Sequence, residues 1–284
     1  MTESAQDRCR RYRLRILEIS QQVTAAHVAP AFSCVEIVDA LYNEIMRPDD
    51  IFIMSKGHGC LAQYVVLEDK GLLSRQDLDD YCKPEGRLGA HPDYAPEIGI
   101  HASTGSLGHG LGIAVGQAYA ERLKGKNTAV YCLLSDGECQ EGSTWEAAMM
   151  AVNLRLCNLI CLIDYNDFGG MARLSETHPA LSPLADKFRA FGWTVGCFGS
   201  KGSEIDGHWT DQIVDTVNRR DRNWPLPGRR KPMIVVCKTI KGKGVSYMED
   251  EPIWHYRSPN AEEYIQAVEE LNDVNTTRVT SQSL

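Results

Sequence analysis

Two almost uninterrupted apolar runs in this chain each lead into a side chain whose oxygen can bind a metal ion. The run Ala129–Leu134 leads into Asp136, and the run Leu159–Asp164 leads into Asn166. Continuous apolar runs are typical of parallel strands that are covered on both faces. Ligands of open parallel sheets bind outside the carboxyl ends of the strands. We therefore predict that Asp136 and Asn166 lie close together at one edge of a parallel sheet.

The rest of the chain alternates between strand-like and helical patterns, which favours a parallel sheet joined by helical crossovers. Further strand-like runs are Ile51–Met54, Thr194–Phe198 and Met233–Lys238. Helical patterns cover Asp7–Val23, Cys34–Met46, Leu61–Lys70, Gly105–Leu123, Thr144–Asn153, Pro183–Phe191, Trp209–Arg219 and Tyr264–Leu271. We predict an α/β fold, a doubly wound and mostly parallel sheet with helices on both faces, in one domain over residues 1–271. Residues 272–284 form a polar tail that we expect to be disordered.

Composition narrows the functional classes. The formal charge of −8 argues against nucleic acid as the main partner. No apolar run approaches the ~18 residues of a membrane span, and the polar, basic stretch 1–15 lacks the apolar core of a secretory signal. We expect the ten cysteines to be reduced thiols and the protein to be cytoplasmic. Cys157 and Cys161 lack a second pair at metal spacing, so a zinc site is not expected.

The oxygen ligands at the two strand ends suit a magnesium ion that holds a diphosphate. Mg²⁺ takes a few protein oxygens and keeps phosphate oxygens as further ligands. Asp136, the Asn166 amide and a nearby backbone carbonyl would supply the protein share. The glycine-rich segment 105–112 would let backbone amides approach an anion at the start of a helix. Because Asp-Gly after a strand is also common turn chemistry, a plain strand-to-helix turn is the alternative.

Asp136-Gly137 is followed 30 residues after Asp136 by Asn166. This spacing resembles the motif of enzymes that bind thiamine diphosphate, and Ser135 stands where that motif usually has a glycine. Other segments resemble the N-terminal domain of transketolase in the family's order and spacing. They are Ser55-Lys56-Gly57-His58, Gly89-Ala90-His91-Pro92, Thr104–Gly110, Asp136–Ala147, Asp206-Gly207-His208, Lys238–Gly244 and Trp254-His255. The resemblance implies the thiamine-diphosphate-binding fold, thiamine diphosphate and Mg²⁺ (or Ca²⁺) as cofactors, and transfer of a two-carbon ketol unit.

The resemblance also implies roles for single residues. The metal ligands would be Asp136, Asn166 and the carbonyl of Phe168. The cofactor contacts would be Lys56, His58, Gly105, Leu107, Gly137, Asn166, Lys241 and His255. The catalytic candidates are His27, His58, His91, His255, Glu141 and Glu146. Imidazoles suit proton transfer to and from sugar hydroxyls because they titrate near neutrality.

Three departures from the family pattern lie near the expected substrate channel. Pro30 stands where a cofactor-contacting serine is frequent, His109 stands where glutamine is common, and Asp167 replaces a frequent lysine. These differences suggest a substrate other than the ordinary pentose phosphates.

In full-length transketolases the glutamate that activates the cofactor lies in a second, pyrimidine-binding domain, and this chain ends where the first domain ends. It therefore resembles the N-terminal subunit of a split transketolase. We expect a separately encoded pyrimidine-binding chain as partner, a heterotetramer with two copies of each chain, and a phosphorylated sugar as donor. The helix from Gly142 is the expected contact, with Trp145 buried there.

Glu141 and Glu146 would couple to the partner's glutamate, or would simply be acids near a helix start. Two functional alternatives stay open. One is a hybrid with the 2-oxo acid dehydrogenases that passes the two-carbon unit to a lipoyl carrier protein, and the other is a catalytically silent homologue.

Overall fold

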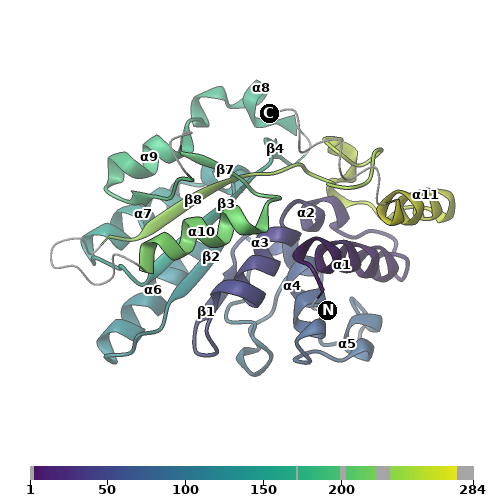
Figure 1. The fold of residues 1–284 in the computed structure, drawn as a ribbon, viewed down its shortest axis with the longest axis horizontal. Helices are drawn as coiled ribbons and strands as arrows, with labels where there is room; N and C mark the ends of the chain where they lie inside the picture. Colours follow the sequence, from purple (N-terminus) through teal and green to yellow (C-terminus); the bar gives the residue numbers. More distant parts are fainter. Residues whose placement is uncertain (1–2, 171, 199–202, 222–230, 274–284) are drawn as a thin grey trace.

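The computed structural model describes residues 3–170, 172–198, 203–221 and 231–273. Across these residues, one sheet of six parallel strands forms the centre of the molecule (Figure 1). Its strands are β1 (Ile51–Met54), β2 (Val130–Ser135), β3 (Leu159–Tyr165), β6 (Thr194–Val195), β7 (Glu204–Asp206) and β8 (Met233–Lys238). The order is β1-β2-β3-β8, and both β6 and β7 pair with β8. The predicted parallel sheet is confirmed, whereas the predicted tail lies, from residue 274 on, outside the described residues.

Helices cover both faces of this sheet, as predicted. One face carries α3 (Val35–Ala40) and α10 (Thr210–Asp221). Beside them, α1 (Ala5–Ser20) and α4 (Cys60–Asp69) pack on α3, and α2 (Val28–Ser33) packs on α1 and α4. The other face carries α6 (Gly110–Leu123), α7 (Gly142–Asn153) and α9 (Leu184–Phe191). Outside these layers lie α5 (Arg75–Asp79), α8 (Leu174–Thr177), α11 (Ala261–Asn272), the hairpin of β4 (Phe168–Gly169) with β5 (Ala172–Arg173), and the single turns η1 (Leu41–Ile45), η2 (Gly57–Gly59), η3 (Pro96–Ile98), η4 (Gly137–Gln140), η5 (Pro179–Leu181) and η6 (Pro252–Tyr256). None of the helices in the described ranges has both the length and the apolar character of a membrane span.

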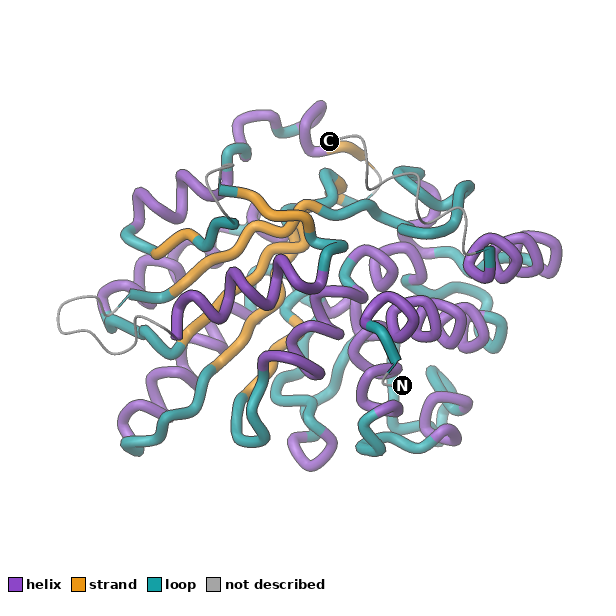
Figure 2. The backbone as a smooth tube through the Cα atoms, viewed as in Figure 1, coloured by secondary structure: helices purple, strands orange, loops and turns teal. Residues whose placement is uncertain are grey.

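The long strands β2, β3 and β8 are mostly apolar because their side chains alternate between two cores. Leu133 and Leu162 belong to the core under α1 to α4, whereas Leu134 and Ile163 belong to the core under α6, α7 and α9. Figure 2 shows the strands running side by side with helices in front of them and behind. The register pairs Leu133 with Leu162 and continues to the last residue of β2. The ends of β2 and β3 are therefore level, and the residues that follow them meet.

Several short elements differ from the sequence prediction. α2 was not predicted. It contains Pro30, which usually interrupts a helix but is tolerated in the first turn, where Pro30 lies. β7 has three residues, and β6 ends at Val195 rather than Phe198, so neither is long enough to show a period of two. The helix predicted over 34–46 is divided, because α3 ends at Ala40 and continues as one π-helical turn.

Candidate active site

Asp136 lies at the carboxyl end of β2, directly against the segment that follows β3. Its side chain is fully buried, and its backbone N–H donates to the carbonyl of Asp164 at 3.2 Å. The carboxylate accepts the N–H of Gly137 at 2.8 Å and the N–H of Asp167 at 2.6 Å. The meeting of the two strand ends predicted from the sequence is thus present, and Asp136 connects them.

The segment 166–168 places two further oxygens beside this carboxylate. The Asn166 amide oxygen accepts the N–H of Phe168 at 3.0 Å, and Asp167 between them has a left-handed φ of 68°. A Cβ added to Gly137 would lie 3.3 Å from the Phe168 carbonyl oxygen. Gly137 therefore lets the turn after β2 approach this carbonyl closely.

These groups fit a hard divalent cation. Burial, and then the charge of Asp164, raises the pKa of Asp136 to about 7, and a cation bound to the carboxylate would favour its ionised form. Within the described parts of the chain, no group of three His, Cys, Asp or Glu side chains is placed to hold a metal by itself. One carboxylate with an amide and a carbonyl oxygen instead suits Mg²⁺, which completes its shell with phosphate and water oxygens.

Asp164 organises the floor of this site, a role that the sequence analysis missed. Its carboxylate accepts hydrogen bonds from the Ser33 hydroxyl at 2.7 Å, from the Thr239 hydroxyl and from the Lys56 ammonium. It also accepts from the Asn166 amide nitrogen at 3.3 Å, which directs the amide oxygen away from Asp164. Asp164 therefore orients a candidate metal ligand without being one.

Lys56 is fully buried beneath the site, paired with Asp164. Burial by itself would lower the pKa of Lys56, but the Asp164 carboxylate outweighs it and raises that pKa. The ammonium also donates to the carbonyl of Pro30 at 3.0 Å. Protein oxygens hold the ammonium, so Lys56 contributes positive charge to the site without contacting a phosphate directly.

The four predicted catalytic histidines lie together, and we call the outer margin of this group the mouth of the site. The ring centroid of His27 is 5.3 Å from that of His91, 5.6 Å from that of His255 and 6.0 Å from that of His58. The Nδ1 atom of His27 is buried and has no hydrogen-bond partner among the described residues. Burying an imidazole nitrogen without a hydrogen-bond partner costs free energy. A ligand that hydrogen-bonds to this nitrogen would remove that cost. We call these four residues the histidine cluster.

Burial sets the protonation state of the histidine cluster. Desolvation, followed by the charge of His255, lowers the pKa of His27 to about 3, and desolvation, followed by Lys241, lowers the pKa of His255 to about 4. Desolvation also lowers the pKa of His58 and of His91. The expectation that these imidazoles titrate near neutrality is therefore wrong, because burial keeps them neutral near pH 7. Each neutral ring offers one nitrogen as an acceptor.

These shifts predict that acid destabilises the ligand-free chain. In the unfolded chain an imidazole titrates near about 6.5, whereas folded His27 stays neutral down to about 3. Between these values the unfolded state binds more protons, so stability falls as the pH falls. Urea titrations from about pH 7 to about pH 5 should show this loss, and His27→Phe should reduce it. His178→Gln, at an exposed histidine, is the control, and equal pH slopes for wild type and His27→Phe would contradict the prediction.

Lys241 lies beside the histidine cluster and the metal-ligand segment. Its ammonium contacts Nδ1 of His255 at 3.2 Å, donates to the carbonyl of Gly170 at 3.0 Å and lies 4.8 Å from the Phe168 ring centroid. Burial, and then the charge of Lys56, lowers the pKa of Lys241 to about 8. Lys241 therefore joins the histidine cluster to the segment that carries the candidate metal ligands.

His208 holds the segment that carries Lys241, and the sequence analysis assigned it no role. Its Nε2 accepts the N–H of Ile240 at 2.8 Å, so this nitrogen carries no proton, and its Nδ1–H donates to Glu36 at 2.9 Å. Arg13 clamps the same Glu36 carboxylate with two hydrogen bonds of 2.6 and 2.8 Å. This buried network fixes the direction in which the Lys241 segment leaves β8.

The glycine-rich loop before α6 packs tightly against the rest of the site. A Cβ at Gly105, whose φ is 141°, would lie 2.9 Å from the His91 ring, and a Cβ at Gly57 would lie 2.7 Å from the Gly105 nitrogen. Leu107 is half-buried in this loop. Glu138, a further residue missed by sequence reasoning, accepts the Gly108 N–H at 2.9 Å. The loop is thus held beside both Gly137 and the histidine cluster.

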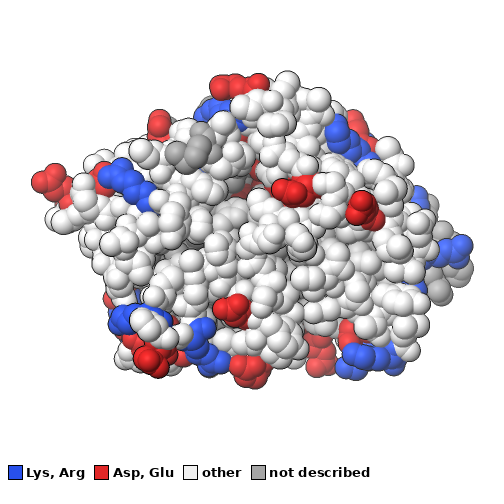
Figure 3. Space-filling view, turned by 180° about the vertical axis from the view of Figure 1, so that it is seen from behind, with Lys and Arg blue, Asp and Glu red and all other residues white. Residues whose placement is uncertain are grey.

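Glu141 and Glu146 are exposed at the start of α7, and Glu141 lies against Gly108 of the glycine-rich loop. Beside them, α6 and α7 expose apolar and glycine positions, namely Gly112, Ile113, Gly116, Met149 and Met150. We call this set the α6–α7 face. Viewed from behind, the side of the molecule that α6 and α7 cover has a broad uncharged area with few charges in its middle (Figure 3). Such a surface is characteristic of a protein–protein contact.

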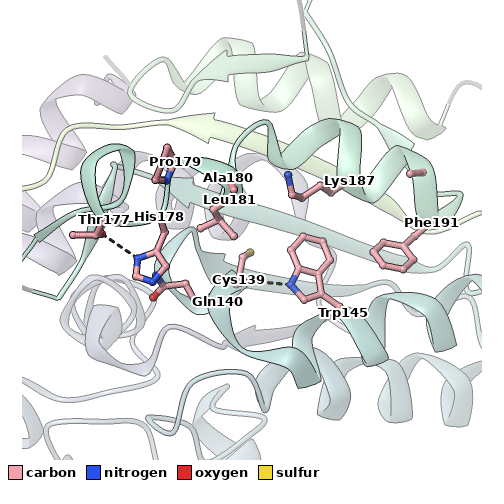
Figure 4. A pocket seen from close by; sticks show the side chains of 11 residues that line it. Cys139, Gln140, Trp145, Thr177, His178, Pro179, Ala180, Leu181, Lys187 and Phe191 are labelled. Carbon is pink, nitrogen blue, oxygen red and sulfur yellow. Dashed lines mark hydrogen bonds between the residues drawn. The ribbon is translucent and has the colours of Figure 1, made fainter.

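The Trp145 side chain packs against residues of its own chain instead of projecting toward a partner. Its ring stacks on Phe191 at 5.7 Å, and its Nε1–H donates to the carbonyl of Cys139 at 2.9 Å. It forms one wall of an open cavity of about 820 Å³, which also has Leu181 and Lys187 in its lining (Figure 4). The expected burial of Trp145 by a partner is therefore already partly achieved within the chain.

Comparison with known proteins agrees with this geometry. The family described as "Transketolase, thiamine diphosphate binding domain" matches residues 6–275, so the chain belongs to the transketolase family.

Two relatives, both named as transketolase subunits, are similar over almost their full length. The chain is 37% identical over 270 residues to an apulose-4-phosphate transketolase subunit of Phocaeicola vulgatus, covering 92% of this chain and 91% of that protein. It is 38% identical over 264 residues to the 6-deoxy-6-sulfo-D-fructose transketolase subunit SqwG of a Clostridium species, covering 90% and 91%.

The solved structure of transketolase from Leishmania mexicana shares the fold, with a TM-score of 0.84 at 24% identity. The match covers 95% of this chain but 42% of that one, so the chain spans about two fifths of the solved enzyme.

Proposed function

We propose that this chain is the diphosphate-binding subunit of a thiamine-diphosphate-dependent enzyme that transfers a two-carbon ketol unit from a ketose phosphate to an acceptor. The observation that carries the proposal is the convergence of Asp136, Asn166 and the Phe168 carbonyl with the histidine cluster at the strand ends of one sheet. When bound, thiamine diphosphate supplies the stabilisation of negative charge on carbon that such transfers require.

The residues divide into three tasks. Asp136, Asn166 and the Phe168 carbonyl hold Mg²⁺ or Ca²⁺, and Gly137 lets the diphosphate approach the backbone. Gly105, Leu107 and Lys241 contact the cofactor, while Lys56 contributes positive charge through its buried position. His27, His58, His91 and His255 orient the sugar and exchange protons with its hydroxyls, because neutral imidazoles can accept and then return a proton.

A second chain completes the enzyme in this proposal. Two of the relatives are named as subunits, and the chain spans about two fifths of a solved transketolase. The α6–α7 face offers an uncharged surface for the pyrimidine-binding partner, with Glu141 and Glu146 at its edge. Closed two-fold symmetry is the commonest arrangement, so we propose two copies of each chain. All ten cysteines are free thiols, which supports a reducing compartment such as the cytoplasm.

The buried metal-ligand set and the partnerless nitrogen of His27 favour an active enzyme over a silent homologue, because burying such groups without a ligand costs stability. Co-expression with the candidate partner chain tests the proposal. Products of the purified complex should be identified against a panel of ketose phosphates and aldehydes. Failure to form a ketol-transfer product from every donor, by a complex that binds thiamine diphosphate, would reject it.

His58→Ala and His255→Ala should each lower the turnover rate of the complex by ~10²–10⁴-fold, which is typical for the loss of one positioned acid–base group. Their effect on metal-dependent cofactor binding should be much smaller, because neither side chain belongs to the metal-ligand set. Steady-state kinetics and calorimetry on the same preparations measure both. His178→Ala is the control at an exposed histidine, and wild-type rates for both variants would contradict the assignment.

A further inference from the structure

Tyr256 lies on the outer side of the histidine cluster. Its ring centroid is 4.4 Å from that of His27, nearer than the ring of any other member of the cluster. Yet 52% of Tyr256 is exposed. One side of the phenol therefore covers the cluster while the other side faces outward.

The neighbours of Tyr256 fix its place. Trp254 is buried, with the Arg257 guanidinium 4.2 Å above its ring centroid. Arg257 in turn donates to both carboxylate oxygens of Glu263, at 2.6 and 2.8 Å. On the other side of Tyr256 in the chain, His255 contacts Lys241 at 3.2 Å. Because residues before and after Tyr256 are held, its ring is a built part of the mouth.

The margin of the cluster offers contacts for a hydroxylated ligand. Arg257 is already engaged by Glu263 and Trp254. The groups near Tyr256 are then its own ring face and hydroxyl, the neutral imidazoles, and the Lys241 ammonium that contacts His255. An aromatic ring with a polar tip offers apolar contact area and one hydrogen bond. A hydroxylated carbon chain can make both of these contacts.

We propose that Tyr256 is a specificity-determining residue that limits the length of the acceptor reaching the histidine cluster. The inference rests on the proposed ketol transfer and extends it to the acceptor class, namely short hydroxyaldehydes. The ring acts by occupying space over His27, so ring size rather than the hydroxyl sets the limit. Longer acceptors must displace the ring or bind with their chain outside the mouth.

The test uses the co-purified two-chain complex, one accepted ketose phosphate as donor, and a series of unphosphorylated hydroxyaldehydes of increasing length. Tyr256→Ala should raise kcat/KM for the longest aldehydes relative to the shortest by about tenfold or more, a change typical of one or two methylene-sized differences in a pocket. Tyr256→Trp should shift the ratio the opposite way, and Tyr256→Phe should keep the wild-type ratio.

Ile253→Ala is the matched control, because Ile253 is an exposed residue of the same turn that no ring contact joins to the cluster. Thiamine diphosphate affinity, measured by calorimetry, should be the same in all four variants. An unchanged length preference in both Tyr256→Ala and Tyr256→Trp, in complexes that transfer the ketol unit, would overturn the inference alone. A wild-type complex that transfers nothing to any aldehyde would instead reject the proposed function and the inference with it.

Discussion

The chain purified without a partner is expected to catalyse no ketol transfer, even when it is supplied with thiamine diphosphate and Mg²⁺. The described residues provide a candidate metal-ligand set and a histidine cluster, but Glu141 and Glu146 are exposed at the start of α7. Activation of the cofactor ring needs a carboxylate facing its aminopyrimidine, and the family resemblance assigns that glutamate to the pyrimidine-binding domain. Mixing the two chains should restore turnover, measured by a coupled assay of product formation.

Light scattering of the restored complex should give the mass of two copies of each chain. Met150→Asp is a sharper disruptor of this assembly than a change at Trp145, because Met150 is 49% exposed on the α6–α7 face. Leu72→Asp, at an exposed leucine near the end of α4, is the control for surface charge. Turnover by a preparation shown to contain no partner chain would refute the split-enzyme proposal.

Asp136→Ala is expected to abolish metal-dependent binding of thiamine diphosphate by the complex. It removes the carboxylate of the proposed metal-ligand set and leaves the N–H groups of Gly137 and Asp167 without their acceptor. A divalent cation that holds a diphosphate then keeps only neutral protein oxygens as ligands. Calorimetry with Mg²⁺, repeated with a chelator, measures the loss.

The ligand-free Asp136→Ala chain should nevertheless fold. Burial raises the pKa of Asp136 to about 7, so the chain without cofactor carries the cost of a desolvated carboxyl group, which the variant removes. Thermal unfolding without ligand checks this point. Asp167→Asn is the control: it removes a nearby carboxylate, which contacts Ser175, and asparagine tolerates the left-handed φ at this position. Unchanged cofactor affinity in Asp136→Ala would show that the metal assignment is wrong.

The positions of Asp136 and Asn166 were predictable from local sequence. Each follows a continuous apolar run, and parallel strands covered on both faces end at the same edge of a sheet. The alternation that makes Leu133 and Leu134 face opposite cores is also a local property, because it follows from the two-residue period of a strand. Clustering of the histidines was predictable only through the family motifs, because no periodicity relates them.

The sequence by itself thus determined the parallel α/β sheet, the strand-end oxygens and the family. Only the tertiary structure decided which side chains those oxygens and cations pair with. Lys56 and Asp164 are 108 positions apart, and Glu36 and His208 are 172 positions apart, so no local sequence pattern predicts either pair. The same holds for Tyr256 above His27. Such contacts form because burial leaves a charged or polar group few partners, and which partners are within reach depends on how the helices pack around the sheet.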